Sequence, residues 1–447
     1  MRALAELLSD WGWRITGSDA SPSDRQRWAL ARRGIDVCDG HRAENLPARA
    51  DLLIYSAAVP AENPERVAAR GRGMEEVSYP AMIGRLMNSR TGIAIAGTHG
   101  KSTVTALLGW ILRSAGRDAS LLCGAELCGM DSAGWGGRDR VLVAESCEYR
   151  RHFLQLRPQF GAVLDIEPDH FDCFRDESDA VSAYAAFVQS IPADGLLVCR
   201  GGCLGKVVER GNAQARVETF DTDRPARWTA RGIESSGRQT RFDVEYEGRS
   251  WGECRLPIPG RHNVRNALAA AALAVALGVE RDAVADGLST FPGLRRRFEW
   301  LGAWRGADLI DDYAHHPTSI RAVLRTARSL FGERRVWAVF QPHQVSRTRA
   351  LFREFSASLA LADEVLVSPV YAAREQVERE PVELAEALAK RVRMSQGRGR
   401  FVSSLDHVVS TLETDARPGD VVVMMGAGDI EQVRDELCRR IQRNHAS

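Results

Sequence analysis

Short apolar runs alternate with longer amphipathic segments along the chain, which predicts strands alternating with helices. In residues 1–90 the predicted order is helix, strand, helix, strand, helix, at Ala3–Trp11, Trp13–Gly17, Asp24–Arg33, Asp51–Tyr55 and Pro64–Arg72. This order predicts a Rossmann-like domain with a parallel sheet. The block starts inside its first helix, without the strand and glycine-rich turn that open such a fold. We expect upstream in-frame codons to encode both.

The alternation continues through residues 91–294. The predicted strands are Ile93–Ala96, Val141–Ala144 and Ala162–Ile166, and the predicted helices are Val104–Ala115, Ala180–Gln189 and Asn263–Leu277. Residues 205–255 are rich in Arg and Glu and predict small antiparallel strands.

Residues 295–447 repeat strand and helix once more. We expect strands at Leu309–Ile310, Val336–Phe340, Glu364–Val367 and Val421–Met424, and helices at Ile320–Ser329 and Arg349–Leu361. The glycine turn at 426–429 is interpreted as structural rather than as a dinucleotide loop, because a lone Gly-x-Gly is a weak signal. The predicted fold class is therefore α/β with three domains, each with a mostly parallel sheet: Rossmann-like (1–90), phosphate-loop ATPase (91–294) and Rossmann-like (295–447).

Composition narrows the classes of function. A length of 447 residues allows several domains with buried cores, and a net charge of +1 argues against nucleic acid or anionic membrane as a partner. No apolar run approaches the roughly 18–20 residues of a membrane span. The nine cysteines show no zinc-type spacing. We expect a cytoplasmic protein without membrane insertion, and the sequence leaves its oligomeric state open.

A glycine-containing turn connects a predicted strand to a predicted helix. The turn consists of Gly97, Thr98, His99, Gly100, Lys101, Ser102 and Thr103. This layout binds the phosphates of ATP or GTP, with Lys101 against the β- and γ-phosphates and the Ser102 hydroxyl on Mg²⁺. The strict eight-residue pattern is broken, because Ile95 stands where its first glycine belongs. The alternative is a glycine turn without a ligand.

The scarcity of lysine favours the phosphate-binding interpretation. The chain has only three lysines, Lys101, Lys206 and Lys390, among its sixty basic residues. One of the three stands in the glycine turn, where a planar guanidinium cannot replace a compact ammonium.

Further polar residues follow predicted strands, where open α/β sheets bind ligands. Glu145 ends the second strand of the middle block, and Asp169-His170 follows the third. We predict Glu145, His170 and Ser102 as ligands of the cation. The alternatives are a solvated acid and a packing histidine.

Two later segments carry unusually dense chemistry. Asp311–Pro317 holds two acids, a tyrosine and two histidines, and Phe340–Arg349 is a polar segment that starts at the end of a strand. A zinc site at His315 and His316 is less favoured, because adjacent histidines rarely share a metal and no third ligand is evident.

The motifs stand in a fixed order: Gly97–Thr103, Glu145, Glu167–His170, Pro259–Ala267, Gly293–Phe298, Asp311–Pro317 and Phe340–Arg349. Together with Ser56–Pro60 and Asn63–Glu65, they resemble the motifs of the Mur ligases across all three blocks. The last two motifs are specific to the branch that adds alanine and its close relatives. Other branches carry a modified lysine shortly after the Asp-His pair, where this chain has Tyr184, Ala185 and Ala186.

The resemblance implies an ATP- and Mg²⁺-dependent ligase that joins L-alanine to the carboxylate of UDP-N-acetylmuramate through an acyl phosphate. Such an enzyme serves peptidoglycan precursor synthesis and, through it, cell shape and division. The three blocks would hold the UDP-sugar, ATP and the amino acid in turn. The resemblance also implies adenine near Asn263 and Asn266, phosphate contacts at Arg297, and Tyr313, His315 and Arg347 around the amino acid.

The chain departs from the family in three places. The strand and turn that cradle the UDP pyrophosphate are not present before Met1, residues 146–150 read Ser-Cys-Glu-Tyr-Arg, and Gln344 stands where the family usually has Arg. One alternative is a relative that adds a peptide or another amino acid to the same sugar, since the Glu148-Tyr149 pair also occurs in that branch. Another is a regulatory protein that binds nucleotide without ligation.

Overall fold

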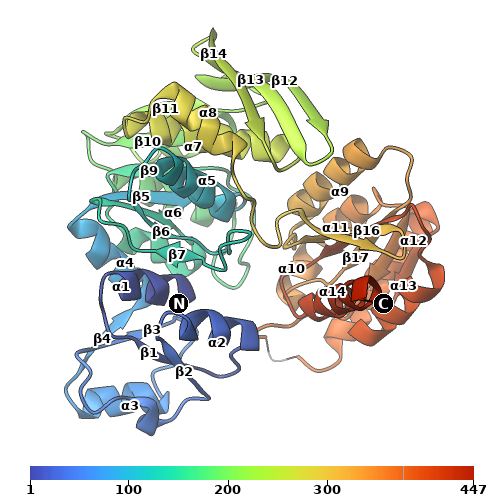
Figure 1. The fold of residues 1–447 in the computed structure, drawn as a ribbon, viewed down its shortest axis with the longest axis horizontal. Helices are drawn as coiled ribbons and strands as arrows, with labels where there is room; N and C mark the ends of the chain where they lie inside the picture. Colours follow the sequence, from blue (N-terminus) through green and yellow to red (C-terminus); the bar gives the residue numbers. More distant parts are fainter. Residues whose placement is uncertain (376, 447) are drawn as a thin grey trace.

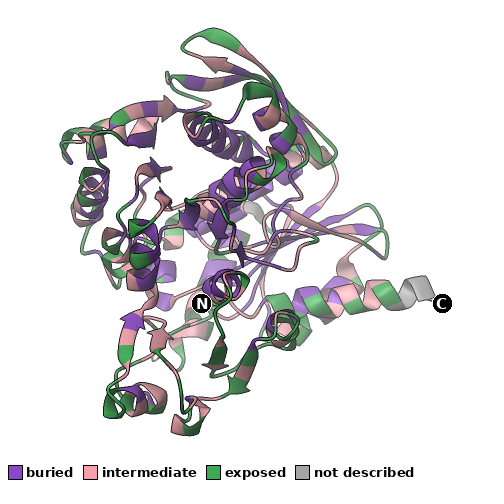
Figure 2. Ribbon diagram, turned by 60° about the vertical axis from the view of Figure 1, so that its left-hand side comes forward, coloured by how far each residue is buried: buried purple, intermediate pink, exposed green. Residues whose placement is uncertain are grey.

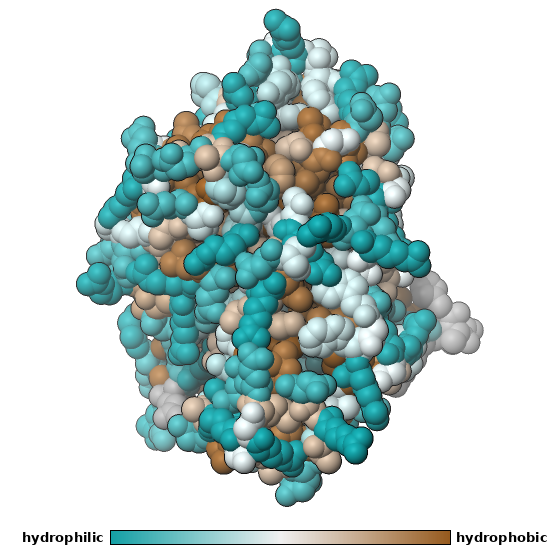
Figure 3. All heavy atoms as spheres, turned by 90° about the vertical axis from the view of Figure 1, so that its left-hand side faces the viewer, coloured by the Kyte–Doolittle hydropathy of each residue, from teal (hydrophilic) through white to brown (hydrophobic). Residues whose placement is uncertain are grey.

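The protein is described by a computed structural model, which covers residues 1–375 and 377–446. It folds into three α/β domains in chain order (Figure 1). Buried residues concentrate in the sheets and on the helix faces that cover them (Figure 2). Hydrophilic side chains cover most of the face shown in Figure 3, with hydrophobic atoms between them. The predicted fold class is confirmed.

The amino-terminal block contains two separate two-stranded parallel sheets, β1–β2 and β3–β4, where we expected one sheet. The sequence pattern missed β2 and β4, because both are short and mix acidic with apolar residues. The elements are α1 (Arg2–Asp10), β1 (Thr16–Asp19), α2 (Asp24–Ala31), β2 (Asp36–Asp39), β3 (Leu52–Tyr55), α3 (Pro64–Gly71), β4 (Glu75–Ser78) and α4 (Tyr79–Asn88).

The middle block is built on a ten-stranded sheet of order β14-β13-β12-β11-β10-β9-β5-β8-β6-β7. Its strands are β5 (Thr91–Ala96), β6 (Ser120–Leu122), β7 (Gly134–Trp135), β8 (Val141–Glu145), β9 (Phe160–Val163), β10 (Leu196–Arg200), β11 (Arg216–Phe220), β12 (Trp228–Ser236), β13 (Gln239–Tyr246) and β14 (Arg249–Leu256). Its helices are α5 (Lys101–Ser114), α6 (Glu177–Gln189), α7 (Arg261–Ala276) and α8 (Arg281–Ser289).

Strand β5 is covered on both faces of the middle sheet. Ile93 and Ile95 face one hydrophobic core, which α5, α7 and α8 cover, while Ala94 and Ala96 face a second core. Leu4, Leu7 and Leu8 of α1 belong to that second core, so the first helix packs on the middle sheet. Both faces being covered explains the continuous apolar run of β5.

Two predictions for the middle block were partly wrong. Helix α5 begins at Lys101, three residues before the predicted start, because the phosphate-loop residues themselves form its first turn. In the stretch 205–255, β12, β13 and β14 are antiparallel as expected, but Gly205–Glu209 is a helical turn and β11 pairs in parallel with β10.

The carboxyl-terminal block has a six-stranded sheet of order β15-β16-β20-β17-β18-β19, in which only the edge strand β15 is antiparallel. Its strands are β15 (Glu299–Trp304), β16 (Ala307–Asp312), β17 (Val336–Phe340), β18 (Glu364–Val367), β19 (Gly399–Phe401) and β20 (Val421–Met425). Its helices are α9 (Pro317–Phe331), α10 (Val345–Ala350), α11 (Phe352–Leu359), α12 (Glu380–Gln396), α13 (Leu405–Asp415) and α14 (Glu431–Ala446). Within the described residues, none of the helices has the length and apolarity that crossing a bilayer requires.

Glu6 joins α1 to the middle domain. Its carboxylate is fully buried and accepts hydrogen bonds from the backbone N–H groups of Ala133 (3.0 Å) and Gly134 (3.1 Å) and from the Ser132 hydroxyl (3.0 Å). Arg2 Nε donates to the same carboxylate at 2.8 Å. Since buried N–H groups without acceptors are costly, this contact should contribute strongly to stability.

We predict that Glu6→Ala lowers the free energy of unfolding by about 2–4 kcal/mol, because the buried N–H of Ala133 loses its acceptor and Arg2 loses its buried partner. Urea denaturation of the purified chain measures the change. The control is Glu44→Ala, at an exposed glutamate, which should shift stability by no more than about 0.5 kcal/mol. Equal denaturation midpoints for the two variants would show that the Glu6 contacts do not stabilise the fold.

Candidate functional site

The phosphate loop connects the end of β5 to the start of α5. Gly97 (φ +143°) and Gly100 (φ +81°) adopt conformations that side chains disfavour, and a Cβ on Gly100 would lie 2.6 Å from Asn266 Oδ1. Asp165 fixes the loop, since its backbone oxygen accepts from Thr98 N at 3.1 Å and its carboxylate accepts from His99 N at 2.8 Å. The first N–H groups of α5 lack partners within the helix, which is the usual setting for phosphate.

Lys101 is held inside this loop. Its Nζ donates to Gly97 O at 2.6 Å and Thr98 O at 3.3 Å, and lies 3.0 Å from Glu148 Oε2. Burial alone would raise the pKa of Glu148, but Lys101 and His170 lower it overall. Burial opposes the charge on Lys101, yet Glu148 raises the pKa of this lysine above its ordinary value. Lys101 is therefore an ammonium facing the loop.

The predicted cation ligands gather at one edge of the sheet. Strand β5 lies between β8 and β9, which brings Glu145 and the segment containing His170 to either side of the loop. Glu145 Oε2 accepts from Gly124 N at 2.7 Å, and a Cβ on Gly124 would meet that oxygen at 2.6 Å. His170 Nε2 lies 3.6 Å from Glu148 Oε1.

These residues fit Mg²⁺. The Ser102 hydroxyl and the Glu145 carboxylate are the hard oxygen donors that this ion prefers, and Ser102 is buried beside the loop. Glu148 adds a buried carboxylate beside these donors, and its Oε2 lies 3.0 Å from Lys101 Nζ. Ser102, Glu145 and His170 remain predicted ligands on this basis.

Asn263 and Asn266 lie in the first turns of α7, beneath the phosphate loop. Both are buried; Asn266 Nδ2 donates to Asn263 Oδ1 at 3.3 Å, and Asn263 Nδ2 donates to Pro259 O at 2.7 Å. Their contact with adenine remains a prediction.

The carboxyl-terminal residues form a continuous row beside the loop. Arg297 Nη2 donates to Ser102 Oγ at 3.3 Å, and its guanidinium lies 5.1 Å from the Tyr313 ring centre. The rings of Tyr313 and His315 meet edge to face at 5.2 Å, and His315 lies 5.9 Å from His343. His343 Nδ1 is 3.2 Å from Arg347 Nη1, which completes the row.

Arg347 has a partner that the sequence did not reveal. Only 2% exposed, it donates from Nε to Asp169 Oδ1 of the middle domain at 2.7 Å. Burial raises the pKa of Asp169, but Arg347 and neighbouring histidines hold this pKa well below its usual range. Burial and Arg347 together lower the pKa of His315 well below its ordinary value, so this imidazole is neutral. Asp169 thus compensates part of the charge of Arg347, and only the remainder is available to a ligand.

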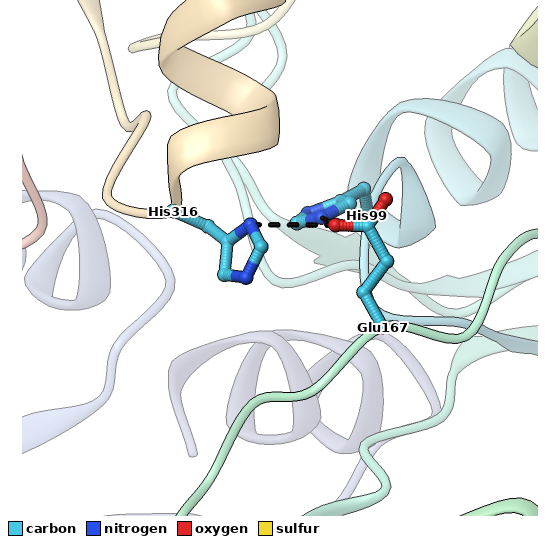
Figure 4. A group of neighbouring side chains, drawn as sticks. All are labelled: His99, Glu167 and His316. Atoms are coloured by element: carbon cyan, nitrogen blue, oxygen red, sulfur yellow. Dashed lines mark hydrogen bonds and ion pairs between the residues drawn. The ribbon is translucent and has the colours of Figure 1, made fainter. Parts of the chain in front are cut away.

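A second contact between the two domains surrounds Glu167 (Figure 4). Glu167 Oε2 accepts from Thr318 Oγ1 at 2.6 Å and lies 3.3 Å from His99 Nε2 and 3.5 Å from His316 Nδ1. Ser319 Oγ lies 3.2 Å from the other ring nitrogen of His99. Burial opposes ionisation of Glu167, but His99 and Thr318 outweigh it and lower the pKa to about 2.

His99, Glu167 and His316 are the residue types of a metal site. The sequence did not show that His99 and Glu167 lie beside His316. His315 does not take part, as expected for adjacent histidines: its Nδ1 lies 2.8 Å from Tyr313 O. The donors of the cluster already contact protein groups, including Pro168 O, which lies 3.2 Å from His316 Nε2. We therefore interpret it as a joint between the phosphate loop and the start of α9.

The structure brings the predicted site residues into one region and adds others. Sequence reasoning missed the roles of Glu148, Glu167, Asp169, His99 toward Glu167, and His343. Four of these stand in motifs already singled out, which was the available signal, and Glu148 lies three residues after Glu145. Gln344 has φ +68° and immediately precedes α10, beside His343.

Comparison with known proteins gives a consistent result across the chain. Residues 1–91 match the Mur ligase family catalytic domain, residues 95–274 the Mur ligase middle domain, and residues 296–428 the Mur ligase glutamate ligase domain. The chain is 38% identical over 440 residues to UDP-N-acetylmuramate–L-alanine ligase of Desulfitobacterium hafniense, covering 98% of this chain and 96% of that protein.

Two solved structures share the whole architecture. The UDP-N-acetylmuramate–alanine ligase of Thermotoga maritima superimposes with a TM-score of 0.81 at 25% identity, covering 99% of this chain and 96% of that one. A murein peptide ligase of Psychrobacter arcticus gives a TM-score of 0.73 at 26% identity, covering 98% and 96%. The resemblance seen in the sequence motifs is confirmed, and the chain belongs to the Mur ligase family.

Proposed function

We propose that this protein uses ATP to join L-alanine to the carboxylate of UDP-N-acetylmuramate, forming ADP, in peptidoglycan precursor synthesis. The observation that carries the proposal is the position of the phosphate loop directly against the Tyr313–Arg347 row, with Arg297 in contact with Ser102. A nucleotide site and a site for a carboxylate-bearing amine are thus adjacent. The names of the relatives support both substrates.

The residues suit a reaction through an acyl phosphate. Lys101 and Arg297 would bind the γ-phosphate and offset the charge that develops as the sugar carboxylate attacks phosphorus. Mg²⁺ held by Ser102 and Glu145 would add further charge neutralisation. Arg347 would orient the α-carboxylate of the amino acid, and neutral His315 would leave the incoming amine without a competing cation.

We assign the three domains their roles on the same basis. Residues 1–90 would bind the UDP-sugar, residues 91–294 ATP, and residues 295–447 the amino acid. A polar group in the first domain supports its role, because Ser18 Oγ lies 2.9 Å from His41 Nδ1 and donates to Glu65 Oε2 at 2.7 Å near the carboxyl ends of β1 and β2. The cytoplasmic location stays a prediction.

A second candidate is a ligase that attaches a peptide to the same sugar. Tyr149 packs 5.2 Å from His170, and the guanidinium groups of Arg150 and Arg374 lie 5.4 and 5.7 Å from its ring. This basic surface beside the site would suit a second substrate that carries additional carboxylates. The similarity to a murein peptide ligase also supports this second candidate function.

Phosphate release by the full chain tests the proposal. With ATP and Mg²⁺ present, release should require both UDP-N-acetylmuramate and an amino acid, with L-alanine ahead of glycine, L-serine and the L-Ala-γ-D-Glu-meso-diaminopimelate tripeptide. Release that is independent of the sugar would contradict ligation, and a preference for the tripeptide would favour the second candidate.

We predict that Lys101→Ala lowers turnover by about 10³-fold, because charge stabilisation at the transferred phosphate is lost. Lys101→Arg should not restore it, since the planar guanidinium does not fit the loop. The matched control is Lys206→Ala, whose lysine is nearly half exposed and pairs with Glu177. Near-normal phosphate release by Lys101→Ala would remove the basis for the ATP site.

Gln344→Arg should lower the Michaelis constant for L-alanine about tenfold or more, because a charge-assisted contact replaces a neutral amide beside Arg347. Gln344→Met, of similar length but without hydrogen-bonding groups, should not lower it. Steady-state kinetics with varied L-alanine measure both variants. If Gln344→Arg binds alanine no better, and the wild type prefers another amino acid, Gln344 marks a different specificity.

A further inference from the structure

Arg296 precedes the proposed phosphate contact Arg297 and has an uncommon backbone conformation. Its φ is +58°, and that of Phe298 is +49°, in the left-handed region that residues with side chains rarely adopt. Arg296 O accepts from Tyr313 N at 2.7 Å, and the Arg296 guanidinium lies 5.2 Å from the Tyr313 ring centre. Because strained backbone persists only where its surroundings hold it, the groups that bind Arg296 also affect where Arg297 and Tyr313 lie.

The side chain of Arg296 is bound to the last helix of the chain and to the turn before it. Nη2 donates to Gly426 O at 2.6 Å, and Nη1 donates to Glu431 Oε2 at 3.3 Å. Gly426 directly follows β20, and Glu431 is the first residue of α14. Arg296 Nε also lies 3.4 Å from Asp311 Oδ2 of β16. Arg296 therefore connects the Tyr313 side of the site to α14.

Asp311 is shared between Arg296 and a second arginine, Arg434 of α14. Asp311 is only 1% exposed, and Arg434 Nη1 donates to its Oδ2 at 3.4 Å. The other carboxylate oxygen, Oδ1, has no hydrogen bond in the part of the chain that the structure describes. Burial raises the pKa of Asp311 to about 6, although both arginines oppose this rise. The carboxylate thus depends on its two cations to be ionised at neutral pH.

Apolar packing fixes the position of Arg434. Ile430, Val433 and Leu437 of α14 are buried in the core that also contains Leu309 of β16. Arg434 follows Val433 directly, so the helix brings its guanidinium to Asp311 at the end of the same strand.

Other titratable groups that face Asp311 do not replace Arg434. They are Glu299 and Asp312 on the sheet and Cys438 on α14. Glu299 accepts from Arg296 N at 2.9 Å, and Asp312 accepts from Phe298 N at 2.7 Å. Both acids disfavour a further negative charge, so Asp311 without Arg434 would keep only Arg296 as a close cation among the described residues.

We propose that Arg434 is a positioning residue for ligation and acts through Asp311. The shared carboxylate fixes Arg296, and Arg296 fixes the backbone that presents Arg297 and Tyr313. Protonation of Asp311 removes this constraint, so turnover falls as the pH drops. The inference deepens the proposed function and rests on it, because Arg297 and Tyr313 were assigned to the phosphate and the amino acid there.

The pH dependence of phosphate release at saturating substrates tests the proposal. Arg434→Met should move the acidic limb of the turnover profile to higher pH by about one unit or more, because loss of a cation disfavours the ionised form of Asp311. On the alkaline side, turnover should approach that of the wild type. A merely structural role of Arg434 would instead lower turnover equally at every pH.

Three further variants complete the test. Arg434→Lys should return the acidic limb toward the wild-type pH, since the positive charge is restored. Asp311→Asn should have low turnover throughout the pH range, and the addition of Arg434→Met should lower it no further. The matched control on the same helix is Arg439→Met, because Arg439 is 61% exposed and pairs with Glu436. This control should leave the profile unchanged.

Urea denaturation separates the ion pair from the proposed function. Since the pKa of Asp311 is about 6 in the fold, above its ordinary value of 3.8, ionisation of this group lowers stability as the pH rises. The fall should be steeper without Arg434. Relative to the wild type, Arg434→Met should therefore lose more stability at about pH 8 than at about pH 5, where Asp311 is largely neutral in both chains.

Two results would overturn the inference. One is an acidic limb that Arg434→Met leaves in place, and the other is a loss of turnover that is uniform across the pH range. If the wild type ligates no substrate while the pH-dependent loss of stability is observed, the proposed function fails and the ion pair between Arg434 and Asp311 stands.

Discussion

Three carboxylates that follow strand β9 hold the phosphate loop and the carboxyl-terminal domain together. Asp165 binds the loop backbone at His99, Glu167 accepts from Thr318 at the start of α9, and Asp169 binds Arg347. The three acids occupy every second position from residue 165 to residue 169. One short segment therefore reaches both the phosphate loop and the neighbouring domain. These contacts join the domain that carries Lys101 to the domain that carries Arg297, Tyr313 and His315.

The contacts of Asp169 and Glu167 depend on the burial and the ionisation of the two carboxylates. Asp169 and Arg347 are both nearly inaccessible, so either charge alone would be strongly unfavourable in this interface. Glu167 has a pKa of about 2, below its ordinary value of 4.5, so its stabilisation is complete above pH 4.5 and is lost only as the pH falls toward 2. At neutral pH Glu167 is therefore ionised and accepts from the neutral Thr318 hydroxyl, while Asp169 and Arg347 pair as opposite charges across the two domains.

The sequence predicted best what depends on local pattern. Strands β17 and β18 were predicted with their observed bounds, because both are short apolar runs flanked by polar residues. The phosphate loop was recognisable for the same reason. Strands β2 and β4 lack an apolar run and were missed, and the division of the first block into two sheets has no local signal.

The site was predictable residue by residue but not contact by contact. Lys101, Glu145 and Arg297 could be named from motifs, yet the bond between Asp169 and Arg347 joins residues 178 positions apart and exists only because two domains pack together. Glu148 was hidden for a related reason, since its importance lies in its burial between Lys101 and His170. Such relations depend on tertiary packing, which periodicity and spacing do not encode.

We propose that the contacts of Glu167 couple the phosphate loop to the proposed amino-acid site. A double-mutant cycle tests it most directly, with the Michaelis constant for L-alanine measured in Glu167→Gln, Thr318→Val and the double variant. We predict that each single change raises the constant and that the double variant is no worse than the more severe single variant, because both remove the same contact. Independent effects that multiply in the double variant, or single variants that bind L-alanine as the wild type does, would contradict it.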